Sequence, residues 1–380
     1  MVPASLMETL SALAGELRMG RRTGELLPAL RDEGAFALLQ AESRGGREAA
    51  WPEFVAATRE AASACPAAGW LIATCGINAA LVARMPEAAQ ERVWSRNSRP
   101  VIAGAGRPME SRVVATSEGY RVDGRWDHVL AGASADWVLA SSTYDGSPCV
   151  VLIPASRLDV EDAEVRVLRG SGCAHVRANG IEVHRDFLIA DAELFADKPD
   201  VIYRNNLYNI DLFAFYISAR LGALVGAAEG AYREYVNITE KWVSGIGGHQ
   251  VAKFTQVQVR LAETNADLAG AALLLDQSTA TLQGCIESGR APDERKRAEL
   301  RRNNAYVARK SLESTERLVV QMGARGLLDS NPVQHFFVDI RAMAAHESME
   351  WASNMSAMGK SLLGLETESR PAPDSLFAGG

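Results

Sequence analysis

Several common classes of protein are excluded by what this chain of 380 residues lacks. Its five cysteines form no C-x-x-C pair, which favours buried, reduced thiols over a disulfide framework or a zinc site. No apolar run reaches the roughly 18–20 residues of a membrane span, and no charged-then-apolar signal peptide is present. We therefore expect a soluble, cytoplasmic protein that binds no metal and no membrane. The cysteines are Cys65, Cys75, Cys149, Cys173 and Cys285.

An excess of basic residues is also missing. The formal net charge is −7, which gives no electrostatic reason to bind nucleic acid. A dinucleotide fingerprint is missing as well, because Gly104-Ala105-Gly106 has neither a third glycine nor a following helix start. We therefore expect neither a nucleic-acid partner nor a Rossmann-type nicotinamide site.

The amino-acid composition and the spacing of apolar residues change twice along the chain. Up to Asn97 it is rich in Ala, Leu and Glu, with apolar residues at helical spacing. From about Pro100 to Leu188, short β-branched runs separated by Gly, Asp, Ser and Pro predict an all-β segment. Beyond about Asn206 the sequence is helical again and long enough for a bundle of about four or more helices. The expected parts are a helical domain (1–97), a β domain (98–200), a helical bundle (201–365) and a flexible tail (366–380).

The segment Asn331–His346 carries the most informative pattern. Pro332 fits the first turn of a helix, where its missing N–H costs nothing. A helix from there places several residues on one face because they recur every three to four positions. An imidazole would then project from an apolar stripe, either as a hydrogen-bonded core residue or as a base that titrates near neutral pH. The residues of this face are Phe336, Asp339 or Ile340, Met343 and His346.

Three further segments combine small, polar and aromatic residues. Gly124–Trp137 reads as a β-hairpin with small residues in a tight turn, and Leu168–Cys173 reads as a turn before a strand. Trp70 is expected in the core. Asn78, within an apolar helix, needs a hydrogen-bond partner because a buried unsatisfied amide costs about 1–3 kcal/mol.

Taken in order, these motifs resemble the flavin-dependent monooxygenases built on the acyl-CoA dehydrogenase fold, two-component hydroxylases of phenols and polyketides with relatives that act on indoles and thiophenes. The resemblance implies a mainly α protein with a central β-barrel-like domain and a C-terminal helical bundle. It further implies a flavin between the β domain and the bundle, and a homotetramer in which a neighbouring subunit completes the site. The matching segments are Gly124-Arg125-Trp126, Ala135-Asp136-Trp137, Met322–Gly326, Asn331–His346 and Met358–Gly364.

The resemblance also implies the chemistry. Reduced FAD or FMN, supplied by a separate flavin reductase, would react with O₂ to a C4a-hydroperoxide that oxygenates an aromatic, indole-type or polyketide metabolite. His346 would be the catalytic base, because relatives place theirs seven residues after the same aspartate. The flavin would contact Ala103, Leu130, Ala131 and Gly323, and the substrate would contact Trp70, Asn78, Ser171, Phe336 and Met343.

Departures from the family pattern leave more than one function open. Leu130-Ala131 replaces a common Ser-Gly, and the missing hydroxyl favours a bulkier aromatic or indole-type substrate over a simple phenol. Glu347 follows Asp339 by eight residues, as the catalytic glutamate does in acyl-CoA dehydrogenases, so an acyl-CoA dehydrogenase-like oxidoreductase is the main competitor. Oxygenation of a nitrogen or sulfur atom is compatible with the same fold, and a non-enzymatic helical scaffold is also considered.

Overall fold

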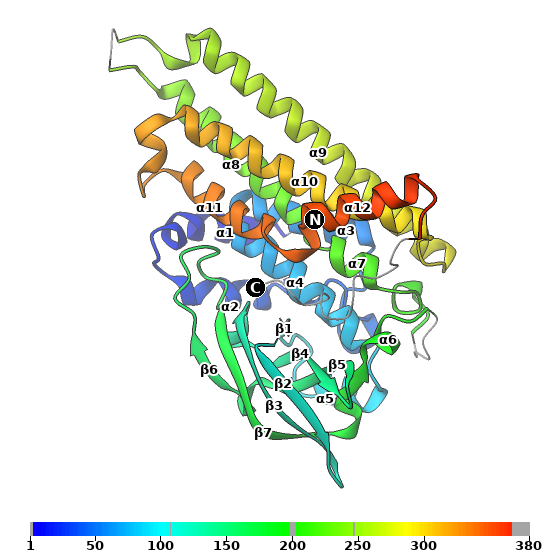
Figure 1. The fold of residues 1–380 in the computed structure, drawn as a ribbon. Helices are drawn as coiled ribbons and strands as arrows, with labels where there is room; N and C mark the ends of the chain where they lie inside the picture. Colours follow the sequence, from blue (N-terminus) through cyan, green and yellow to red (C-terminus); the bar gives the residue numbers. More distant parts are fainter. Residues whose placement is uncertain (1–2, 107, 198–202, 246–247, 367–380) are drawn as a thin grey trace.

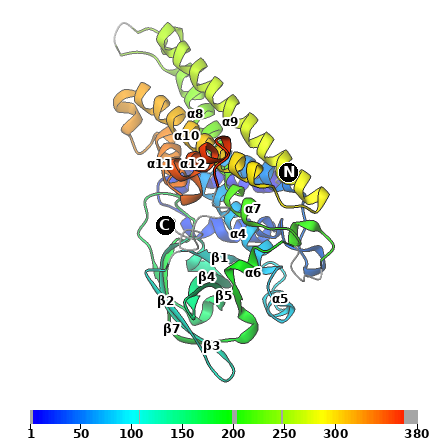
Figure 2. The same cartoon turned by 45° about the vertical axis from the view of Figure 1, so that its right-hand side comes forward.

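The computed structural model describes residues 3–106, 108–197, 203–245 and 248–366. Helices from the two ends of the chain stack on one side of a single sheet. The long C-terminal helices lie outermost, the sheet lies at the opposite end, and the N-terminal helices lie between them (Figure 1). The same three layers are seen after a 45° turn (Figure 2). Of the expected flexible tail, only Glu366 is among the described residues.

The N-terminal helices are built around one apolar helix. Every residue of α4 is buried, as expected for a helix that is apolar on all sides. Pro66 stands at its first turn, where no N–H is needed, and Cys65 separates it from α3. The helices are α1 (Ala4–Arg18), α2 (Leu26–Asp32), α3 (Trp51–Ala64), α4 (Pro66–Val82) and α5 (Glu87–Trp94).

The described strands form one eight-stranded sheet in the order β6-β7-β3-β2-β4-β5-β8, with β1 paired in parallel to β4. The β-branched runs therefore form strands, as their composition predicts. The strands are β1 (Ile102–Ala105), β2 (Glu110–Ala115), β3 (Gly119–Val129), β4 (Trp137–Tyr144), β5 (Ser147–Pro154), β6 (Asp159–Asp162), β7 (Ala174–His184) and β8 (Leu188–Ala190).

The hairpin expected in Gly124–Trp137 is wrong. Both edges of β3 are already paired, with β2 on one side and β7 on the other, so β4 cannot lie beside it. Between the two strands the chain turns at Ala131, which has a φ of 62°, and passes through the short helix η4 (Gly132–Ser134). The small residues of this segment therefore lie in a crossover connection between β3 and β4, which are not neighbours in the sheet.

The C-terminal bundle contains two long antiparallel helices, α9 and α10. Gly289, with a φ of 61°, ends α9, and Asp293 caps α10 by accepting a hydrogen bond from the Lys296 N–H (2.9 Å). The sequence Gly-Arg-Ala-Pro-Asp at 289–293 is typical of a turn between two helices, and the structure has the turn there. The helices of this region are α6 (Asp191–Leu194), α7 (Phe213–Ser218), α8 (Leu221–Lys241), α9 (Thr255–Ser288), α10 (Glu294–Gln321), α11 (Pro332–Ala344) and α12 (Trp351–Leu362).

Glycines bring α3 and α8 into backbone contact. A Cβ added at Gly226 would overlap the carbonyl oxygen of Arg59, and one at Gly222 would lie 2.7 Å from the carbonyl oxygen of Val55. These glycines are one helical turn apart, so they form a smooth stripe on α8. The close approach fixes the start of α8 against the N-terminal helices.

The described residues contain neither a membrane-spanning helix nor a cluster of metal ligands. Within the described ranges, no helix is long and apolar enough to cross a bilayer. The same residues contain no group of His, Cys, Asp or Glu suited to a metal ion. All five cysteines are buried and free, and burial raises the pKa of the Cys65 thiol to about 11. The thiols are therefore protonated and unreactive.

Candidate active site

One face of α4 carries Trp70, Thr74 and Asn78, spaced four residues apart. The Trp70 indole is 3% exposed and meets the His346 imidazole edge-on, with ring centroids 5.7 Å apart. Two predicted site residues from opposite ends of the chain are thus brought together. The Thr74 hydroxyl oxygen is buried and has no hydrogen-bond partner in the described part of the chain.

His346 does not belong to the helix on which it was expected. α11 ends at Ala344, and His346 has extended dihedral angles (φ −62°, ψ 138°) as the N-cap of the short helix η10 (Glu347–Met349). Its Nδ1 accepts a hydrogen bond from the Ser348 N–H (3.2 Å). The same Nδ1 lies 2.9 Å from the Ser348 Oγ. The side chain thus competes successfully for a local backbone donor and ends the helix early. The shared helical face with Phe336 and Met343 is therefore a wrong prediction for His346.

Arg220 completes this group, although the sequence pattern did not single it out. It lies between α7 and α8, is 3% exposed, and donates from Nη1 to the Tyr216 carbonyl oxygen (3.2 Å). Its guanidinium lies 4.9 Å from the centre of the Tyr216 ring and 5.9 Å from that of Trp70. No spacing rule links Arg220 to Trp70. The one sequence feature that could have identified Arg220 is that it is a lone arginine in an apolar, aromatic stretch.

The protonation state of His346 follows from this surrounding. The residue as a whole is partly exposed, yet the packed protein desolvates the imidazole. Burial first, and the charge of Arg220 second, lower the pKa of His346 well below its usual value of 6.5. The imidazole is therefore neutral at neutral pH, and it does not titrate near neutral pH in the way that the sequence led us to expect of a base.

The β domain contributes a second group of predicted residues. The Ala131 N–H donates to the Ser171 carbonyl oxygen (2.8 Å), so the crossover after β3 is joined to the loop before β7. Ala131 is fully buried, and the buried Ser171 Oγ has no hydrogen-bond partner among the described residues. Leu130 is partly buried beside them. Because the Ala131 N–H is already used, it is not free to bind a ligand.

Asn78 joins α4 to the sheet. Its side-chain amide donates to the Ile102 carbonyl oxygen (3.0 Å), which provides the partner that a buried amide needs. A Cβ added at Gly104 would lie 3.1 Å from the same nitrogen, and the neighbouring Ala103 is fully buried. α4 therefore lies directly against β1.

Three other predicted residues have different surroundings. Phe336 packs under the guanidinium of Arg18 (5.0 Å to the ring centre) and against Gly230 of α8. Met343 is fully buried in the apolar core. Gly323, with a φ of 57°, begins the short helix η9 (Gly323–Leu327) after α10 and has open space around its Cα.

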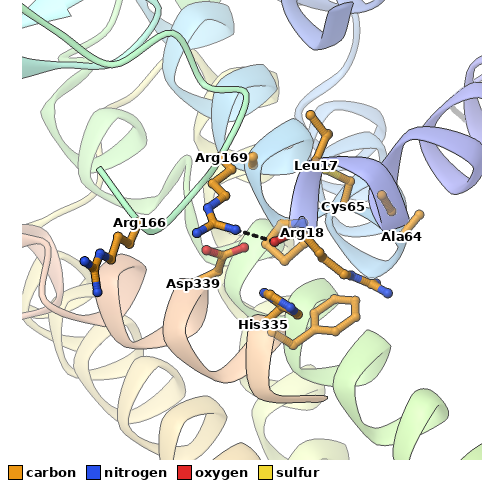
Figure 3. A pocket seen from close by; sticks show the side chains of 12 residues that line it. Leu17, Arg18, Ala64, Cys65, Arg166, Arg169, His335 and Asp339 are labelled. Atoms are coloured by element: carbon orange, nitrogen blue, oxygen red, sulfur yellow. Dashed lines mark hydrogen bonds between the residues drawn. The ribbon is translucent and has the colours of Figure 1, made fainter. Parts of the chain in front are cut away.

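A small pocket beside Phe336 contains the carboxyl group of Asp339. In the sequence, Asp339 served only as the residue from which the spacing to His346 and Glu347 was counted. Asp339 accepts a hydrogen bond from the Leu168 N–H (2.6 Å), and Leu168 has the uncommon φ of 49°. Figure 3 shows this carboxylate facing Arg169, whose side chain donates to the Arg18 carbonyl oxygen, while Arg166 lies apart. Burial raises the pKa of Asp339 to about 7. Asp339 thus connects α11 to the loop that carries Ser171.

Comparisons with known proteins agree with this architecture. Residues 220–351 match the family described as acyl-CoA dehydrogenase, C-terminal domain. The chain is 30% identical over 361 residues to the oxygenase component of an FADH(2)-dependent resorcinol hydroxylase from Rhizobium sp. (strain MTP-10005), covering 90% of this chain and 87% of that protein.

Solved structures give the same result. The 3-HSA hydroxylase of Rhodococcus sp. RHA1 matches with a TM-score of 0.86, 25% identity and 96% of each chain covered. XiaF from Streptomyces sp., solved in complex with FADH2 and glycerol, matches with a TM-score of 0.87 and 96% of each chain covered. At 19% identity this second likeness shows the fold alone. The predicted fold class is confirmed, and the chain belongs to the oxygenase components of the flavin-dependent monooxygenases with the acyl-CoA dehydrogenase fold.

Proposed function

We propose that this enzyme uses reduced flavin and O₂ to oxygenate an aromatic substrate, with His346 as the base that takes the substrate's acidic proton. The observation that carries the proposal is a neutral imidazole held against Trp70 in a desolvated, aromatic surrounding. The relatives named above are a resorcinol hydroxylase and a 3-HSA hydroxylase, which supports hydroxylation of a ring carbon over oxygenation of nitrogen or sulfur.

The residues present fit a flavin. The buried hydroxyl groups of Thr74 and Ser171 have no partner among the described residues, so each can bond a polar ring edge. Ala103 and Ala131 have only a methyl group each, too small to obstruct a planar ring. When bound, reduced flavin would supply an activated oxygen atom derived from O₂. We assign Ala103, Leu130, Ala131 and Ser171 to the walls around it.

Proton transfer at His346 depends on the tautomer. In the structure Nδ1 accepts a hydrogen bond from the Ser348 N–H, which places the hydrogen of the neutral ring on Nε2. To act as a base at Nε2, the imidazole must take the other tautomer, whose Nδ1–H donates to the Ser348 Oγ, 2.9 Å away. Nε2 then accepts the proton of a phenol or an indole N–H as oxygen is transferred. Ser348 is thus a positioning residue, because its N–H favours one tautomer and its hydroxyl oxygen can accept the Nδ1–H of the other.

The partners follow from the same proposal. Without a Rossmann-type fingerprint, the chain would receive reduced FAD or FMN from a separate reductase. We further propose a homotetramer in which Gly323, open to its surroundings, lies near the flavin of a neighbouring subunit. The substrate would contact Trp70 and Asn78 on α4, with Phe336 and Met343 supporting that wall from α11.

A reductase-dependence assay tests the proposal. The purified chain alone is expected to leave NADH unoxidised. With added flavin reductase, flavin and resorcinol as the aromatic probe, a hydroxylated product should form. Catalytic NADH oxidation by the chain alone would contradict the two-component mechanism. Efficient dehydrogenation of an acyl-CoA with an artificial acceptor, abolished by Glu347→Gln, would establish the competing dehydrogenase.

A further inference from the structure

The short helix η10, which His346 caps, is held on its other side by a buried amide. Ser348 contacts the imidazole through its N–H and its hydroxyl group. The carbonyl oxygen of Ser348 accepts a hydrogen bond from the side-chain amide of Asn354 (3.1 Å), and the same amide donates to the Glu350 carbonyl oxygen (2.7 Å). Asn354 lies in the first turn of α12 and is 4% exposed. A single side chain therefore joins η10 to α12.

Arg301 of α10 fixes the orientation of that amide. Its Nε donates to the Asn354 Oδ1 (3.0 Å), and its Nη2 donates to the Ser353 carbonyl oxygen (3.3 Å). Because a guanidinium carries only donors, the oxygen of Asn354 must face Arg301 and the NH₂ group must face η10. A chain of hydrogen bonds thus runs from α10 through Asn354 and Ser348 to His346.

The polar character of this chain of contacts has an energetic cost. Both Arg301 and Asn354 are buried, and an arginine and an amide lose more on leaving water than apolar side chains of similar volume would. Apolar side chains would be enough to pack α10 against α12. They could not fix the Ser348 carbonyl oxygen in one place, because only a hydrogen-bond donor does that. The cost is therefore matched to the one residue that also contacts the imidazole.

The same turn keeps the imidazole away from water. The charged residues around it are Arg220 beside the ring, Glu347 within η10, Glu350 at the start of α12, and Arg301 of α10. Burial is the larger cause of the lowered pKa of His346, and the charge of Arg220 is the smaller one. If η10 loosened, water would reach the ring and the larger cause would be lost.

We infer that Asn354, oriented by Arg301, is a positioning residue for the reaction, because it holds η10 where the imidazole of His346 stays against Trp70 and apart from water. This inference rests on the proposed function, since it takes His346 as the base. It adds two residues that act through the turn and not on the substrate.

Nuclear magnetic resonance of the flavin-free chain, labelled with ¹³C at Cε1 of its six histidines, tests the inference. The signal of His346 is the one that is absent from His346→Ala. Because the Trp70 ring lies edge-on to the imidazole at 5.7 Å, its ring current makes this signal sensitive to the position of the imidazole. In Asn354→Ala the signal should move. The pKa obtained by titrating it should rise toward about 6.5, whereas in the wild type it stays well below that value.

Asn303→Ala is the matched control. Asn303 is also a buried asparagine of α10 whose oxygen accepts hydrogen bonds from an arginine, Arg302. Its amide donates to the Ser278 Oγ on α9 (3.0 Å) and not to η10. The loss of Asn303 should lower stability in urea unfolding to an extent similar to the loss of Asn354. It should leave the position and the pKa of the His346 signal unchanged.

The reaction provides the second measurement. With reductase, flavin and resorcinol, Asn354→Ala should lower the product yield per flavin oxidised about 10- to 100-fold, as expected when a reacting group is misplaced by about 1 Å. The remaining yield should decrease from about pH 8 to about pH 6, where the wild-type yield is constant. Arg301→Lys keeps a cation but loses the Nε donor, so it should cause smaller changes of the same kind. It serves as the test variant if Asn354→Ala does not fold by circular dichroism.

Three results would overturn the inference. The first is a His346 signal that does not move in the Asn354 variant, and the second is an equal movement in Asn303→Ala. The third is a displaced signal with a wild-type product yield, which would make Asn354 a structural residue only. Since the signal is measured without flavin, O₂ or substrate, it stands apart from the reductase-dependence assay. Absence of product from the wild-type chain would contradict the proposed function alone.

Discussion

At His346, two effects act on the imidazole in the same direction. Burial disfavours the charged form, and the nearby cation of Arg220 disfavours it further, so the pKa is lowered well below 6.5. A neutral imidazole can act as the base only in the tautomer that leaves Nε2 without a hydrogen, and the Ser348 Oγ can accept the Nδ1–H of that tautomer. The proposed role of His346 therefore depends on two neighbours, one of them from a distant part of the chain.

Removal of the imidazole should separate oxygen transfer from flavin oxidation. His346→Ala is expected to lower product formation roughly 10²–10⁴-fold, the usual contribution of a positioned base. Peroxide release should continue, since the residues that we propose to contact the flavin are untouched. Product and peroxide measured in one reaction would check this. Glu347→Gln is the control and should cost little; the reverse pattern would assign the base to Glu347.

The lowered pKa also predicts the pH profile. Protonated imidazole cannot act as a base, and in the folded protein protonation begins only below the usual pKa of about 6.5. Product yield per flavin oxidised should therefore stay constant from about pH 8 to about pH 6. A yield that is already halved near the usual pKa of histidine would show that the imidazole is not desolvated as described.

Asp339 should make the stability of the protein depend on pH in the opposite sense from an ordinary ion-paired carboxylate. Its folded pKa, about 7, is above its unfolded value, so the folded state holds a proton that the unfolded state has lost. The stability that this proton contributes decreases as the pH rises from about 4 to about 7. Asp339→Asn keeps an acceptor for the Leu168 N–H and cannot ionise. Its stability relative to wild type should therefore rise between about pH 5 and about pH 8 in urea unfolding; a constant difference would contradict this.

At the scale of the elements, the stripe of glycines on α8 sets the position of Arg220. Gly226→Ala should lower the free energy of unfolding by about 1–3 kcal/mol or more, because its Cβ would meet the backbone of α3. Gly284→Ala is the matched control on α9, where a Cβ has open space. It should raise stability by about 0.5–1 kcal/mol. Equal effects in chemical unfolding would show that α3 and α8 are not in backbone contact.

The elements also show what the sequence could and could not predict. Local composition was enough for the strands and for the turn at Gly289, because β-branched runs and helix caps are short-range signals. The end of α11 was missed because His346 caps a backbone N–H, which helical periodicity does not reveal. The Gly124–Trp137 segment was misread because strand pairing depends on which edges are already occupied.

Long-range contacts limited the prediction of the site. The family resemblance assigned these residues to one site, but it did not predict that Ala131 meets Ser171 or that Trp70 meets His346, and no spacing rule relates them. Neither a motif nor the family resemblance pointed to Arg220. Its significance appears only when its unused donor and its aromatic neighbours are seen together.

At the scale of the whole molecule, the fold places residues of the sheet and residues of other helices around α4. β1 contacts α4 through Asn78, and the crossover at Ala131 is tied to the Ser171 loop, which Asp339 of α11 holds in turn. We propose that these contacts form walls around the flavin, where reduced flavin and O₂ would react with little water present.

Rapid mixing of the chemically reduced flavin–protein complex with O₂ tests this account most directly, because it requires no knowledge of the substrate. The account predicts reoxidation in two phases, with an absorbance transient that precedes the spectrum of oxidised flavin and decays slowly. A single phase, at the rate of free reduced flavin and without a transient, would contradict it.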